Sequence, residues 1–198
     1  MIARHWLFRR LVFVGFVLAP GASGCADSEV TALGAPQLVL SEMRLGGTDR
    51  VASRIDSDVA FGKSVMNGIA SGDSLWLEVA RELPLKSAAA EASFVIALAS
   101  ALPRKPEQVL ELASQKTQVD LVCGIPFLDT TAEGIVAYHA SAASAVARAR
   151  MSSLADAANR CVTALDSARV RKLERIDPSY LIKNKPAAPK RAARRTRR

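Results

Sequence analysis

The stretch TTAEGIVAYHASAASAVARARMSSLADAANRCVTAL, residues 130–165, decides the fold of this chain. Its apolar residues recur at steps of three and four, which is the spacing of one face of an α-helix. Alanine is the best helix former because it loses no side-chain entropy on folding, and it lines both halves of the stretch. Ser152 and Ser153 interrupt the pattern midway. The stretch therefore predicts two long helices joined by a tight turn.

The first of these helices begins with a capping-box pattern. Thr130 and Glu133 are three residues apart, just before the apolar spacing starts. In such a box, the hydroxyl and the carboxylate each accept a hydrogen bond from a backbone N–H that the first helical turn leaves free. We therefore expect Thr130 to be the N-cap of this helix.

Upstream, shorter segments carry the same helical spacing and end at glycine or proline. These segments are 48–71, 73–83, 87–103 and a helix that begins at Pro106. Asp73 is a natural N-cap, and proline suits the first helical position because its missing N–H would have no partner there. The short connections indicate antiparallel neighbours. The sequence predicts an all-α domain over 48–175, built as an antiparallel helical bundle or a short stack of helix pairs.

The N-terminus has the features of an export signal. They are the basic residues Arg4, Arg9 and Arg10, the apolar run 11–19, and the small residues 22–24 before Cys25. The run is far shorter than the roughly 20 residues that a membrane-spanning helix needs. Residues 1–25 are therefore interpreted as a signal peptide that is removed after export. Residues 26–47 mix small residues with glycine and proline, and we interpret them as a tether, with 38–40 as a short strand or adhesive patch.

Cys25 is a candidate lipidation site. The tetrapeptide Ala22-Ser23-Gly24-Cys25 resembles the lipobox of bacterial lipoproteins, in which the cysteine is acylated and becomes the new N-terminus. It departs from that pattern at Ala22, where leucine is usual. The alternative is plain secretion after a cut behind Ala26, since Gly24 and Ala26 also suit a small-x-small site. The lipid-anchored periplasmic form is our first expectation and the secreted form the second.

The formal net charge of +8 comes from the two ends of the chain. Residues 26–182 carry 19 acids and 16 bases, so the predicted domain is slightly acidic. Residues 176–198 lack helix signals and are predicted to be a disordered tail. Its end has no acid and no aromatic residue, so we expect it to bind anionic lipid or a surface polymer by charge alone. The cations of this tail are Lys183, Lys185, Lys190, Arg191, Arg194, Arg195, Arg197 and Arg198.

Motifs for enzymatic chemistry are weak. His139 is the only histidine outside the predicted signal, which excludes metal sites that need two histidines. It lies on the apolar stripe of an alanine-rich helix, so a half-buried structural role is favoured over a hydrolase using His139. Residues 57–64 approach the phosphate-binding loop pattern, but Ser57 replaces its first glycine and the stretch reads as a helix. We predict no catalytic residue, no metal and no cofactor.

Cys123 and Cys161 are the two cysteines inside the predicted domain. They lack the spacing of a metal site, and export would place them in an oxidising compartment, which favours a disulfide. The bridge would join the start of the long helical hairpin to its returning helix. The alternative is two buried free thiols that pack as small apolar residues.

Three stretches resemble a class of exported bacterial α-helical proteins. They are Cys123-Gly124-Ile125-Pro126-Phe127, the helix end at 98–103, and the segment 161–165. The resemblance covers about half the chain, over 71–165, and implies a helical fold with a bridge. It implies no activity, ligand or catalytic residue. We therefore expect a non-enzymatic envelope protein that binds an unidentified protein partner or supports structure.

Overall fold

The computed structural model describes residues 35–127, 130–149 and 153–179. Its regular structure in these residues is entirely helical, without a strand, which confirms the predicted all-α class. The helices are α2 (Pro36–Gly46), α3 (Thr48–Ser57), α4 (Val59–Ser71), α5 (Ser74–Glu82), α6 (Ala88–Ala101), α7 (Pro106–Lys116), α8 (Val119–Val122), α9 (Ala132–Ala149) and α10 (Ala155–Ile176).

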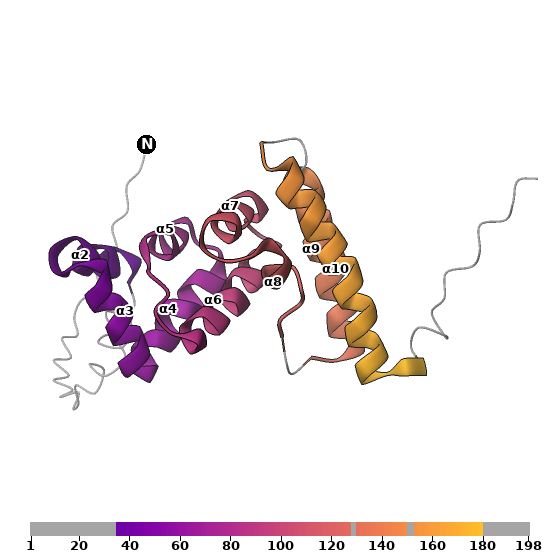
Figure 1. Cartoon of the computed structure of the whole chain (residues 1–198), viewed down its shortest axis with the longest axis horizontal. Coiled ribbons are helices and arrows are strands. Elements are labelled where there is room, and N and C mark those ends of the chain that lie inside the picture. The colour runs from indigo at the N-terminus through magenta and orange to yellow at the C-terminus, as the bar shows by residue number, and fades with distance from the viewer. Residues whose placement is uncertain (1–34, 128–129, 150–152, 180–198) are drawn as a thin grey trace, which may run out of the picture.

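Helices α2 to α7 form a stack of short helices, and the α9–α10 hairpin lies beside it (Figure 1). The short α8 lies where the two parts meet and packs against α6, α7 and α10. Among the described residues, the buried side chains are all apolar and make one continuous core. Alanines 142, 145 and 149 of α9 and 157, 158 and 168 of α10 are buried. Their small size lets the two long helices pack closely, as the sequence predicts.

Helix α2 corrects the predicted tether. Residues 36–46 are helical, and α2 packs against α3 and α5. Val39, Leu40 and Met43 are buried, so the apolar patch over 38–40 is mostly part of the core and is not a strand. Pro36 stands in the first turn, and Gly47 follows the last residue with a φ of 85°. The proline and glycine therefore mark the two ends of a helix rather than an irregular linker.

A second correction concerns 48–71, for which the sequence predicts one helical segment. The chain breaks at Asp58, whose backbone is extended with φ −111° and ψ 97°. Its carboxylate accepts a hydrogen bond from the Phe61 N–H at 3.0 Å. Asp58 therefore ends α3 and caps α4, because its carboxylate accepts a hydrogen bond from an N–H that has no backbone partner in the first turn of α4.

The remaining caps largely follow the sequence. Asp73 accepts hydrogen bonds from two N–H groups of α5, and Pro106 stands in the first turn of α7. Gly72 ends α4 in the left-handed conformation, with a φ of 74°. The cap of α9 differs by one residue, because Thr131, and not Thr130, accepts from the Gly134 N–H at 3.1 Å.

Candidate functional site

The structure places some of the sequence-predicted site residues and leaves others untested. Cys25 and the tail cations from Lys183 to Arg198 lie outside the described residues. Their lipidation and polyanion binding therefore stay predictions. Cys123, Cys161 and His139 lie within the described part, the cysteines where α8 meets α10 and His139 where α9 packs against α10.

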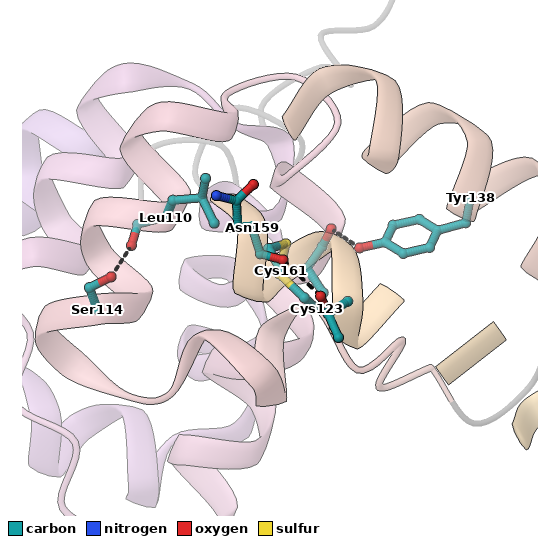
Figure 2. The surroundings of a disulfide bond; sticks show 8 residues. Leu110, Ser114, Cys123, Tyr138, Asn159 and Cys161 are labelled. Carbon is teal, nitrogen blue, oxygen red and sulfur yellow. Dashed lines mark hydrogen bonds between the residues drawn. A yellow bond between two sulfur atoms is a disulfide. The ribbon is translucent and has the colours of Figure 1, made fainter. Parts of the chain in front are cut away.

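Cys123 and Cys161 form the predicted disulfide. Their Cα atoms are 5.2 Å apart, and both side chains are fully buried. Figure 2 shows the bond between the residue that follows α8 and the second turn of α10. The bridge therefore attaches the hairpin to the stack of short helices through the core.

Tyr138 makes a second connection between the hairpin and the stack. Its hydroxyl donates a hydrogen bond to the Ala99 carbonyl at 2.9 Å, and its ring meets Phe127 edge-on with centroids 4.9 Å apart. Burial raises the pKa of Tyr138 well above the ordinary value of 10.0, so the hydroxyl stays protonated and able to donate. Lys172 adds a hydrogen bond from its Nζ to the Phe127 carbonyl at 2.8 Å. These contacts hold α6, α9, α10 and the 124–127 turn together.

His139 has a structural partner. Its Nε2 lies 2.7 Å from the Asp166 Oδ1, and the side chains are 15% and 58% exposed, respectively. The pair joins α9 to α10 across the hairpin. This agrees with the half-buried role predicted for His139. A histidine that acts as a general base also needs a nucleophile within hydrogen-bond reach. The contact that the structure gives to His139 is with Asp166.

The stretch that approaches a phosphate-binding loop is not a loop. Gly62 and Lys63 lie within α4. A Cβ at Gly62 would lie 2.7 Å from the Ile55 carbonyl oxygen, so this glycine permits the close approach of α3 and α4. The rejection of nucleotide binding at 57–64 is consistent with this helical geometry.

A groove between α4 and α6, here called the α4–α6 groove, was not found by sequence reasoning. It has a volume of about 460 Å³. Its apolar lining includes Val59 and Ile96, which are 81% and 37% exposed. The small lining residues are Gly62, Ala70, Ala89, Ala90 and Ala97, and the polar ones are Asp56, Lys63, Asn67, Ser93 and Ser100. The groove thus combines an apolar lining with polar groups that can orient a bound partner.

The described residues contain no cluster of three or more histidine, cysteine, aspartate or glutamate side chains placed to hold a metal ion. No helix within 35–127, 130–149 or 153–179 has both the length and the apolar character to cross a membrane. Comparison of the chain with protein-family models, with curated proteins and with solved structures gives no match. The resemblance to exported bacterial helical proteins therefore stays a prediction.

Proposed function

We propose that this protein is an exported, non-enzymatic helical protein of the cell envelope that binds a partner protein through the α4–α6 groove. The observation that carries the proposal is the apolar groove itself, with Val59 and Ile96 exposed to solvent. Exposed apolar side chains in a concave surface with polar groups around it are typical of binding sites. The groups best placed for chemistry, His139 and Tyr138, are engaged in contacts that join helices.

The shape of the groove favours a helix as the bound element. On α6 its lining runs from Ala89 to Ser100. At 1.5 Å per residue this is about 16 Å, or three helical turns. Ala89, Ser93 and Ala97 follow at four-residue steps, which leaves room for a backbone to approach. An amphipathic helix of about three turns, with its apolar face on Met66 and Ile96, fits this surface.

A pair of neighbouring residues allows a matched test. Ser93 lines the groove, whereas Ala92 is exposed beside it and does not. A photo-crosslinking amino acid at Ser93 should capture one partner segment in intact cells, and Ala89→Trp, which fills the groove, should abolish the capture. The same crosslinker at Ala92 should not yield that product. Equal capture from both positions, or capture that survives Ala89→Trp, would refute binding in the groove.

The proposal places the protein at the membrane through an acylated Cys25, with the secreted form as the alternative. It is supported by the basic residues, the short apolar run and the small residues that precede Cys25.

A second candidate function is binding of an anionic polymer or membrane surface through the tail. The observation that favours it is the density of cations over 183–198, without an acid among them. Binding to anionic vesicles or heparin should weaken with salt and fall when 183–198 are removed. Binding that is indifferent to both changes would exclude this role for the tail.

A further inference from the structure

The surface between α8 and α10 differs in character from the α4–α6 groove. Two hollows of about 540 and 60 Å³ adjoin there and share Arg171. We call them together the α8–α10 groove. Among the described residues that line it, the cations are Arg160, Arg171, Lys172 and Arg175 of α10, and the one acid is Asp120 of α8. It lies apart from the α4–α6 groove, so the two surfaces are independent sites.

The arginines of this groove have no carboxylate partner in the part of the chain that the structure describes. In the stack of short helices, Arg44, Arg54 and Arg81 each lie within 4.0 Å of a carboxylate. By contrast, Arg160, Arg171 and Arg175 form no ion pair with a described carboxylate. These arginines are exposed and follow one face of α10, while the exposed acids Asp156 and Glu174 lie within about one turn of Arg160 and Arg171, respectively. The described lining therefore carries a net positive charge, four cations against one carboxylate, which favours an anionic ligand.

The length of the groove favours a linear polymer over a small anion as the ligand. From Arg160 to Arg175 the helix rises about 22 Å at 1.5 Å per residue. The hollow that holds Arg160 and Arg171 is also lined by the neutral hydrogen-bonding side chains of Asn159, Thr163 and Ser167. Arg160, Arg171 and Arg175 follow one line along α10, which suits the successive groups of a linear polymer. The lining residues that the structure describes include no aromatic side chain, so a nucleic acid would gain no stacking contact from them.

Asp120 favours linear polyanions that carry hydroxyl groups over those that carry anionic groups alone. It stands in the same hollow as Arg160 and Arg171, where it would repel a strand made only of anionic groups. Hydroxyl groups, however, can donate hydrogen bonds to its carboxylate, as well as accept them from the Asn159 amide. A polymer with both anionic groups and hydroxyls offers partners to the arginines, to Asp120 and to Asn159. We propose that the α8–α10 groove binds a linear acidic polysaccharide.

The test uses an oligomer of a polyuronate as the probe and the full-length chain, with the tail cations over 183–198 changed to glutamine so that the groove alone is measured. Changing Arg160, Arg171 and Arg175 together to glutamine should weaken binding by about tenfold and reduce its salt dependence. The matched control changes Arg50, Lys105 and Arg148 to glutamine. These are exposed cations outside the groove, so affinity should change by less than about twofold.

Asp120→Ala separates the two kinds of polyanion by the sign of its effect. The substitution should weaken binding of the polyuronate, because the hydroxyls of this polymer lose the carboxylate that accepts their hydrogen bonds. It should strengthen binding of inorganic polyphosphate, because a charge that repels this polymer is removed. Because Asp120 and the three arginines are exposed, helical circular dichroism should be unchanged in all variants.

An equal loss of polyuronate affinity in the groove variant and in the control variant would overturn the proposal, because binding would then follow net charge alone. Stronger polyuronate binding in Asp120→Ala, or no measurable binding by the starting protein, would also overturn it. If the starting protein bound anionic vesicles in preference to the polyuronate, and the groove variant lost that binding, the surface would be assigned to a membrane instead. None of these outcomes depends on a partner in the α4–α6 groove, so this proposal can fail while the proposed function stands.

Discussion

Removing the Cys123–Cys161 bridge by changing both residues to alanine should strongly destabilise the protein. The two cysteines are 38 residues apart in sequence, and their side chains are fully buried. Closing a loop of that length lowers the unfolded-state entropy enough to contribute about 4 kcal/mol at 25 °C. Removing two buried sulfur atoms adds a packing loss of about 1 kcal/mol each.

We therefore expect a loss of about 5 kcal/mol or more in the free energy of unfolding, which is comparable to the entire stability of many small domains. The variant should also show a steeper dependence on denaturant, because its unfolded chain is no longer held by the cross-link and exposes more surface.

Urea unfolding followed by helical circular dichroism measures both quantities. Cys25→Ser is the matched control, since it removes the third cysteine and should leave the unfolding free energy unchanged. The mass of the wild-type protein isolated without reductant should be lower than that of the reduced chain by two hydrogen atoms. A loss below about 1 kcal/mol would refute the argument from loop closure. Two thiols that alkylate freely in the unreduced, denatured protein would refute the bridge.

Three further changes test other parts of the structure. Tyr138→Phe should cost about 1 kcal/mol of unfolding free energy through the lost hydrogen bond. Because burial raises the pKa of Tyr138, the folded state keeps a proton that the unfolded state loses above about pH 10. Wild-type stability should therefore fall more steeply above that pH than the variant's in urea titrations. Gly68→Ala should lower the melting temperature, because its Cβ would overlap the Trp76 indole, whereas Gly46→Ala meets only the Arg50 side chain. Metabolic labelling with a fatty-acid analogue should mark the wild type and not Cys25→Ser, and label on both or on neither would exclude the anchor.

The elements predicted best are those whose signals are local. The long hairpin follows from a sustained helical period, and Asp73 and Pro106 begin helices because caps act within one turn. The disulfide could be inferred from cysteine number and expected compartment. Helix α8, which Cys123 follows, is only four residues long, so it is too short to show a helical spacing of apolar residues.

The predictions from the sequence were wrong or incomplete where tertiary packing outweighs the local sequence pattern. Helix α2 carries a proline and two glycines near its ends, and burial of Val39 and Met43 against α3 and α5 stabilises it. Neither binding surface could be predicted from the sequence, because each combines residues from separate segments of the chain. The α4–α6 groove unites Lys63 with Ser93, and the α8–α10 groove unites Asp120 with Arg160.

The disulfide also has a predictable effect on only one of the two surfaces. Cys123 stands between Asp120 and Gly124, which belong to one side of the α8–α10 groove, and Cys161 adjoins Arg160 on the other side. The bond thus fixes the separation of the two walls, while α4 and α6 pack against each other without it. The double alanine variant, measured where its helical circular dichroism is intact, should therefore bind the polyuronate more weakly and keep the crosslinking from Ser93. Equal loss at both surfaces would show that the bond supports the whole fold rather than the geometry of one groove.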